Sequence, residues 1–128
     1  QTFHSYCASK PMQLAAARAL SEGDAWLHMA RDAYREAAQL TSRALNLPMP
    51  AGGTFVFFDV NTWLPAGEDD ASLFLHRCLD EGVVITPGAA SGEAYRSWVR
   101  VCFTCVPLDE LREGLKVVSR VLQQPPSR

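Results

Sequence analysis

One arginine stands inside an apolar, β-branched run and is the residue of this chain best suited to bind an anion. The run is Ser97–Thr104, SWVRVCFT, and its composition predicts a strand. Because side chains alternate along a strand, Arg100 would share a face with Trp98, Cys102 and Thr104. The opposite face is predicted to be core and would carry Val99, Val101, Phe103 and Cys105.

An anionic group is expected to meet Arg100, because arginine is rarely buried without a partner. Its planar guanidinium binds a carboxylate through two parallel hydrogen bonds. One possible partner is a carboxylate of the protein, for which Asp59, at the end of another apolar run, is a candidate. The other is the carboxylate of a ligand. Spacing alone leaves both open.

The cysteines are the second group of residues that could do chemistry, namely Cys7, Cys78, Cys102 and Cys105. Cys102 and Cys105 form a C-x-x-C, the spacing used by thiol-redox and zinc sites. Within a strand, residues at i and i+3 lie on opposite faces, and neither a second C-x-x-C nor a nearby histidine completes a zinc site. We therefore expect Cys102 and Cys105 to be small buried residues rather than reactive ones. A thiol-redox protein that uses this pair is the alternative. Four cysteines without a disulfide framework fit a reducing cytoplasm.

Other candidates are weaker. His4, His28 and His76 are far apart in the sequence and have no other metal ligand at a suitable spacing. The sequence shows no motif of a Ser-His-Asp or Cys-His catalytic site. Glu93, Tyr95 and Arg96 precede the Arg100 run and would shape a pocket or simply form a polar loop. The sequence thus predicts no catalytic residue and no metal site.

The composition fits one domain, alone or with an appended piece, and excludes some partners. The chain has 128 residues, 48% of them apolar, and a net charge of −2, so neither nucleic acid nor an anionic membrane surface is expected. No apolar run approaches the roughly 20 residues of a membrane span. The chain begins at Gln1 rather than Met, so we expect a piece of a longer protein.

Hydrophobic periodicity places Arg100 in an α+β fold. A small sheet of three or four strands would be covered by helices and preceded by a long linking helix. The strand at 54–60 is apolar on both faces, so we expect it to be central in the sheet. The predicted elements are helices at 11–20, 24–45, 69–82 and from 107 onward, with strands at 54–60, 83–86 and 98–105.

Three motifs in this order resemble the class I and II pyridoxal-phosphate (PLP) aminotransferases of fold type I. Pro50–Asp59 (PAGGTFVFFD) is similar to the P-x-G-G-x-F strand that opens their small domain. Glu81–Gly88 (EGVVITPG) is similar to their G-V-x-x-x-P-G strand and turn. Tyr95–Phe103 (YRSWVRVCF) resembles their strand with a central arginine. The likeness covers nearly the whole chain and points to the aspartate and kynurenine branches.

The resemblance implies an organisation and a role. Residues 1–23 would be a remnant of the large PLP-binding domain, 24–47 the linking helix and 48–128 the small C-terminal domain. Arg100 would bind the α-carboxylate of the amino acid or 2-oxo acid substrate, and the full-length enzyme would be a cytoplasmic homodimer.

The resemblance also places the cofactor elsewhere. Neither Lys10 nor Lys116 has the family's Schiff-base context, so the cofactor lysine would lie upstream of Gln1. The chain alone is then expected to hold no PLP and to be inactive. The alternative is a stand-alone α+β module that binds a small carboxylate through Arg100; it predicts a fold with no exposed apolar patch.

Overall fold

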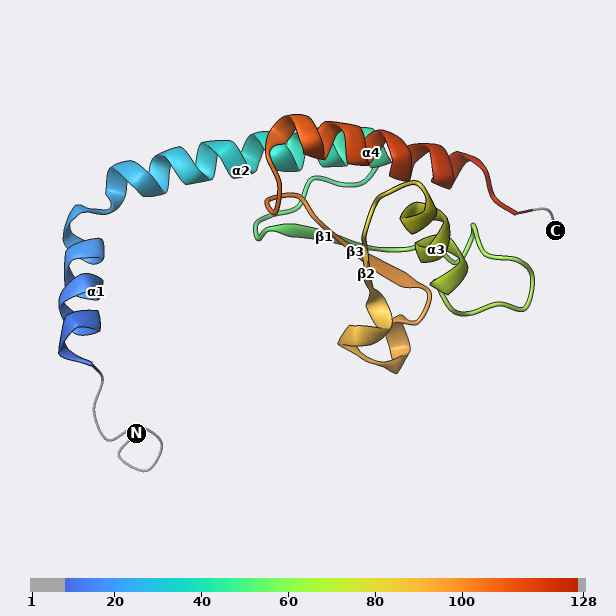
Figure 1. Ribbon diagram of the computed structural model, residues 1–128, viewed down its shortest axis with the longest axis horizontal. Coiled ribbons are helices and arrows are strands. Elements are labelled where there is room, and N and C mark those ends of the chain that lie inside the picture. The colour runs from blue at the N-terminus through green and yellow to red at the C-terminus, as the bar shows by residue number, and fades with distance from the viewer. Residues whose placement is uncertain (1–8, 127–128) are drawn as a thin grey trace, which may run out of the picture. The chain divides into compact units, whose positions relative to one another are not determined.

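The computed structural model describes residues 9–126, so Cys7 and His4 lie outside the described residues (Figure 1). Two compact units divide the chain, Gln1–Ala33 and Tyr34–Arg128. The boundary falls within helix α2 (Asp24–Leu45), which begins at the predicted residue.

The first unit contains α1 (Lys10–Glu22) and the first part of α2. Pro11 occupies the first turn of α1, where its missing N–H has no helical partner to lose, and the helix ends where the Gly23 N–H donates to the Ala19 carbonyl at 3.0 Å. No residue of α1 is buried. The side chains of Met12, Leu14 and Leu20 are 70%, 62% and 88% exposed.

The second unit confirms the α+β prediction. After the remainder of α2, its elements follow in the order β1 (Phe55–Asp59), α3 (Ser72–Asp80), β2 (Thr86–Pro87), β3 (Trp98–Cys102) and α4 (Leu108–Gln123). Two short 3₁₀ turns, η1 (Gly88–Ser91) and η2 (Glu93–Tyr95), connect β2 to β3.

The strand that carries Arg100 lies at the centre of the sheet. The strand order is β1-β3-β2, and β3 pairs antiparallel with both neighbours. The prediction that the strand at 54–60 is central is therefore wrong among the described residues, where β1 pairs with β3 alone. Its second apolar face arises because Phe57 packs against aromatic rings rather than against a covering helix.

The predicted strand at 83–86 is reduced to the two residues of β2. Residues 82 and 83 instead finish α3, since the Gly82 N–H donates to Leu79 and the Val83 N–H to Cys78, both at 2.8 Å. This pair of hydrogen bonds at the end of a helix requires a residue in the left-handed conformation. Gly82, with φ +86°, is that residue. Val84 is consequently 84% exposed rather than part of a ladder.

The core of the second unit lies between one face of the sheet and the helices. In Figure 1, α4 runs beside the C-terminal half of α2, and both lie over the sheet. The Trp63 indole N–H donates to the Val121 carbonyl at 2.7 Å and so joins a loop to α4. The buried apolar residues include Ala37, Ala38 and Leu45 of α2, Val56 and Phe58 of β1, Phe74 and Cys78 of α3, Val99 and Val101 of β3, and Leu111, Leu115, Val118 and Val121 of α4.

Asp70 holds the start of α3. Its Oδ1 accepts hydrogen bonds from the backbone N–H of Ser72, at 2.7 Å, and from the Ser72 hydroxyl. These hydrogen bonds, with a smaller contribution from Arg96, hold the pKa of Asp70 below its ordinary value of 3.8 against the opposing effect of burial. The predicted helix start at Asp69–Asp70 is therefore displaced to Ser72, and the Asp70 carboxylate closes the turn that leads into the helix.

Replacing Asp70 by alanine is expected to lower the free energy of unfolding by about 1 kcal/mol at pH 7, the usual net contribution of a hydrogen bond within a protein. Because the pKa of Asp70 is depressed in the folded state, its contribution is complete above the unfolded pKa and is lost as the pH falls through the folded one. Urea titrations of the wild type and Asp70→Ala should therefore converge as the pH drops below 3.8. A difference in the free energy of unfolding that persists unchanged at pH 2 would contradict this role of the Asp70 carboxylate.

Candidate functional site

Arg100 sits in the middle of β3 and projects from the sheet face opposite the core. It is paired with Phe57 on β1 and Thr86 on β2. Its neighbours Val99 and Val101 are 0% and 8% exposed, whereas Arg100 is half-buried. The predicted alternation of Val99, Arg100 and Val101 is thus confirmed, and three hydrogen-bonded strands fix the backbone position of Arg100.

No carboxylate of the described residues forms an ion pair with Arg100. The guanidinium carbon lies 5.4 Å from the centre of the Phe55 ring, a cation–π contact that leaves the hydrogen-bonding fork open. Asp59, the candidate partner, instead accepts a hydrogen bond from the Asn61 N–H at 2.9 Å and starts a turn. Of the two possible partners of Arg100, a carboxylate of the protein is therefore excluded within residues 9–126, and the carboxylate of a ligand stays possible.

Three aromatic rings pack together on the same side of the sheet as Arg100. The centre of the Phe57 ring lies 5.1 Å from that of Tyr95 and 5.0 Å from that of Trp98, and the last two rings are 5.7 Å apart. We call Phe55, Phe57, Tyr95, Trp98 and Arg100 the aromatic–arginine face. Such a face offers apolar area beside one cation, a combination that suits an organic carboxylate.

Sequence reasoning found only part of this face. It named Tyr95 with Arg96 and Glu93 as a possible pocket, but Arg96 turns to carboxylates of the protein instead. Arg96 lies 3.4 Å from Glu93 and 3.6 Å from both Asp69 and Asp70, and these carboxylates, Asp69 first, raise the pKa of Arg96. Phe55 and Phe57 were missed; their i, i+2 spacing was the available signal.

Backbone hydrogen bonds hold both ends of β3. The Ser97 carbonyl accepts from the Val60 N–H at 2.9 Å, and the Phe103 N–H donates to the Thr54 carbonyl at 3.0 Å. The Arg96 carbonyl accepts from the Ala71 N–H at 2.9 Å, next to the start of α3. Arg100 is therefore carried by a rigid strand, which is where a binding residue is held most precisely.

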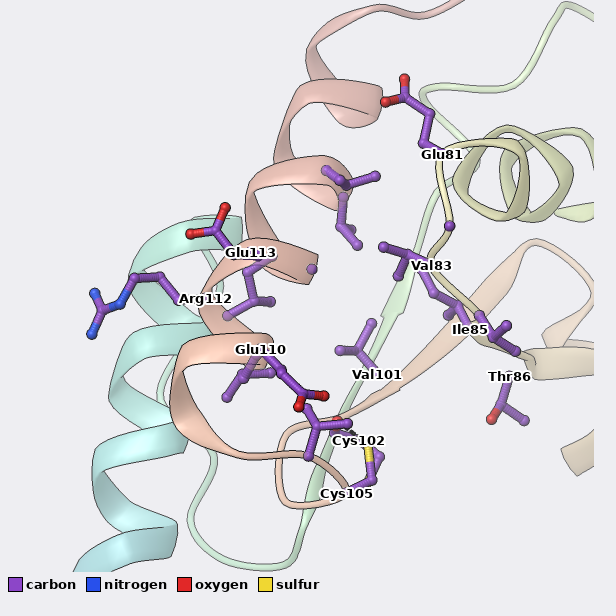
Figure 2. Close-up of a pocket in the computed structure, with 18 of the residues that line it drawn as sticks. Glu81, Val83, Ile85, Thr86, Val101, Cys102, Cys105, Glu110, Arg112 and Glu113 are labelled. Carbon is purple, nitrogen blue, oxygen red and sulfur yellow. Dashed lines mark hydrogen bonds between the residues drawn. The ribbon is translucent and has the colours of Figure 1, made fainter.

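The two cysteines of the C-x-x-C lie together, which the sequence analysis did not expect. The strand ends at Cys102 and the chain bends, so that the Cys105 thiol donates to the Cys102 carbonyl at 3.3 Å. Cys105 is exposed rather than part of the core face, and its predicted placement with Val99 and Val101 is wrong. Both cysteines line an open cavity of about 970 Å³ between α4, the segment 81–86 and the end of β3. Figure 2 shows their side chains beside each other on its wall.

The two thiols differ in their ease of ionisation. Burial opposes ionisation of Cys102, but the backbone N–H and hydroxyl of Thr104, the Cys105 thiol and the charge of Arg100 together hold its pKa below the ordinary value of 9.0. Burial and the neighbouring Cys102 raise the pKa of Cys105. Burial, with Glu81 adding to it, raises the pKa of Cys78 to about 11.

Neither lysine of the chain is placed to hold PLP. Lys10 is exposed at the first residue of α1, and the Lys116 ammonium is exposed and lies 2.7 Å from a Glu113 carboxylate oxygen. A Schiff-base lysine needs a neutral amine in a sheltered site, so the environments of these lysines do not fit the cofactor. Among residues 9–126, no three His, Cys, Asp or Glu side chains gather as metal ligands, and no helix there has the length and hydropathy to cross a bilayer.

Solved structures similar to this chain are aminotransferases. The aromatic aminotransferase of Pyrococcus horikoshii has 25% identity and a TM-score of 0.79, over 95% of this chain and 34% of its own. LysN, the α-aminoadipate aminotransferase of Thermus thermophilus, has 29% identity and a TM-score of 0.67, over 87% of this chain and 30% of its own. The kynurenine aminotransferase of Pyrococcus horikoshii has 27% identity and a TM-score of 0.67, over 87% of this chain and 29% of its own.

The chain therefore spans about a third, or slightly less, of these structures. No curated protein sequence matches it significantly. The family described as aminotransferase class I and II matches residues 1–118, which confirms the resemblance and the small-domain type of fold. This chain belongs to the class I and II aminotransferases, a PLP-dependent family.

Proposed function

We propose that this chain is the substrate-binding C-terminal part of a PLP-dependent aminotransferase, in which Arg100 binds the α-carboxylate of the amino acid or 2-oxo acid. The observation that carries the proposal is the open guanidinium fork of Arg100 on a rigid central strand, with no carboxylate partner among residues 9–126. A half-buried arginine in this state has capacity for one bidentate ligand.

The geometry accounts for what Arg100 would contribute. Two parallel N–H···O bonds fix both the position and the plane of a carboxylate, and they thereby fix the Cα to which it is attached. The aromatic rings of Phe57, Tyr95 and Trp98 pack together on the Arg100 side of the sheet and would give the bound acid an apolar neighbour. PLP supplies the electron-sink chemistry when it is bound elsewhere in the parent enzyme, and this chain orients the substrate toward it.

We also propose the domain assignment that the family implies: residues 1–23 as part of the large domain, 24–47 as the linking helix and 48–128 as the small domain. The exposed apolar side chains of α1, with no buried residue along the helix, support this assignment. They weigh against the self-contained carboxylate-binding module, for which no exposed apolar patch was expected. The small domain would close over bound substrate in a homodimer, as is common for enzymes that exclude water.

The test compares two neighbouring arginines in the full-length enzyme. Arg100→Lys removes the guanidinium of an arginine that has no carboxylate partner among the described residues. Arg96→Lys removes a guanidinium that already forms ion pairs with Asp69, Asp70 and Glu93. If Arg100 binds the substrate carboxylate, only Arg100→Lys should weaken the binding of both amino acid and 2-oxo acid. Equal kinetics in the two variants would refute the proposal.

A further inference from the structure

The thiols of Cys102 and Cys105 form a pair that the proposed role of Arg100 does not use. Cys102 is the last residue of β3, and the bend after it returns Cys105 to within hydrogen-bonding distance of Cys102, with the Cys105 sulfur 3.3 Å from the Cys102 carbonyl oxygen. Figure 2 shows the two side chains next to each other near the start of α4. A short loop that already brings two thiols together needs little rearrangement to join them.

The surroundings of the two thiols differ in a way that assigns them different roles. Cys102 is half-buried, lies 3.6 Å from the Thr104 hydroxyl and has the Arg100 guanidinium on its own face of the sheet. These groups stabilise a thiolate, the form of cysteine that attacks disulfides. Cys105 is exposed and its proton is held more tightly, which suits the thiol that attacks second.

We propose that Cys102 and Cys105 form a reversible intramolecular disulfide when they meet a low-molecular-weight disulfide of the glutathione class. The Cys102 thiolate attacks one sulfur of the oxidant, so that the oxidant's S–S bond breaks, a mixed disulfide forms and one thiolate leaves and takes up a proton. Cys105 then loses its proton to solvent and attacks the Cys102 sulfur, which releases the second thiolate. The protein dithiol is oxidised and the small disulfide is reduced to two thiols.

The other described thiol is unsuited to this exchange. Cys78 is 0% exposed and its pKa is raised to about 11, so it presents neither a thiolate nor an accessible sulfur. A metal-binding role for the pair also lacks support, because residues 9–126 supply no third ligand. Among the three described thiols, oxidation is therefore selective for the loop that carries Cys102 and Cys105. A reversible disulfide of this kind is compatible with a reducing compartment, where disulfides are transient and redox-sensing.

The experiment uses the 128-residue chain with Cys7→Ser, which leaves the three described thiols. The reduced protein is incubated with oxidised glutathione at neutral pH, alkylated with iodoacetamide and digested with trypsin. Cleavage after Arg100 and Arg112 places both cysteines in the peptide Val101–Arg112. We expect this peptide to lose two hydrogen atoms and to resist alkylation, and to regain both thiols with dithiothreitol, while Cys78 stays reduced.

Matched variants separate the two steps. In Cys105→Ser the reaction should stop at Cys102 joined to glutathione, and in Cys102→Ser the internal disulfide is lost and the adduct on Cys105 should form more slowly. Arg100→Gln should shift the pH dependence of the first step to higher pH, because the charge that favours the Cys102 thiolate is gone. The proposal is overturned if the wild-type peptide keeps two alkylatable thiols, if the disulfide joins two chains, or if Cys105→Ser accumulates no adduct on Cys102.

Discussion

If Arg100 binds the substrate carboxylate as proposed, Arg100→Lys is expected to lower kcat/KM of the full-length protein for both the amino acid and the 2-oxo acid by about 10- to 150-fold. Lysine keeps the charge on β3 but replaces a planar fork by a single ammonium, so one of two charge-assisted hydrogen bonds to the carboxylate is lost. Such a bond contributes about 1.5–3 kcal/mol, and each 1.36 kcal/mol corresponds to a factor of about ten. Steady-state kinetics with the amino acid and the 2-oxo acid measure the effect.

The split between the kinetic constants indicates what the lost hydrogen bond did. A bond that only binds substrate would raise KM and leave kcat unchanged, whereas one that also orients Cα would lower kcat as well. We expect both constants to suffer, because a single hydrogen bond no longer fixes the plane of the carboxylate. Arg96→Lys is the control, and its kcat/KM should stay within about twofold, since Arg96 is an exposed arginine with ion pairs of modest value. A larger loss in the control than in Arg100→Lys would reverse the assignment.

Gly88→Ala is expected to destabilise the second unit strongly. A Cβ on Gly88 would lie 2.4 Å from the Tyr95 carbonyl oxygen and 2.5 Å from the Trp98 carbonyl oxygen, well inside the roughly 3.5 Å of an unstrained contact. Because both atoms belong to the backbone, no rotamer change relieves the clash. We expect the free energy of unfolding to fall by about 3 kcal/mol, at the upper end of the usual range for overpacking.

Gly52→Ala is the matched control for this substitution. Its Cβ would meet nothing within 4 Å, so the variant should be neutral or slightly more stable. Urea unfolding followed by circular dichroism compares both with the wild type. Since Gly88 touches the residues that lead into β3, Gly88→Ala should also displace Trp98 and weaken ligand binding at Arg100; a Gly88→Ala chain as stable as Gly52→Ala would show that this loop yields easily.

Local patterns were sufficient for the core of this fold. The alternation of Val99, Arg100 and Val101 predicted their faces correctly, because a buried face fixes the register of a strand. The helix predicted from residue 107 onward is likewise present as α4, and Leu111, Leu115 and Val118 recur at helical spacing along its buried side. In both elements, the spacing of apolar residues within one segment was enough to predict which side chains enter the core.

Features that depend on where a strand stops were not accessible from local patterns. The two cysteines were assigned to opposite faces because the strand was extended to residue 105, whereas the ladder ends at Cys102. Beyond Cys102, the backbone hydrogen bond from the Phe103 N–H to the Thr54 carbonyl still joins the two segments, and the chain then bends toward Cys105. The point at which pairing gives way to this bend depends on a segment far away in sequence, so a pattern within residues 97–105 does not contain it.

The aromatic–arginine face was missed for a related reason. Two apolar faces on the strand at 54–60 suggested a central position, but the second face is covered by Tyr95 and Trp98 from the β3 side. Alternation cannot distinguish burial under a helix from burial under a few rings. Only the pairing of Phe57 with Arg100 brings these residues together.

The hydrogen bond from Trp63 to the Val121 carbonyl bears on how this unit folds during translation. Trp63, the donor, is synthesised 58 residues before its acceptor Val121. The same holds for Arg77, whose guanidinium donates to the Gln124 carbonyl at 2.8 Å. Leu111, Leu115, Val118 and Val121 complete the buried cluster in the same late stretch. A nascent chain that has reached only β3 therefore lacks the part of the core that α4 supplies, and its apolar sheet face is covered only by α2 and α3 until α4 follows.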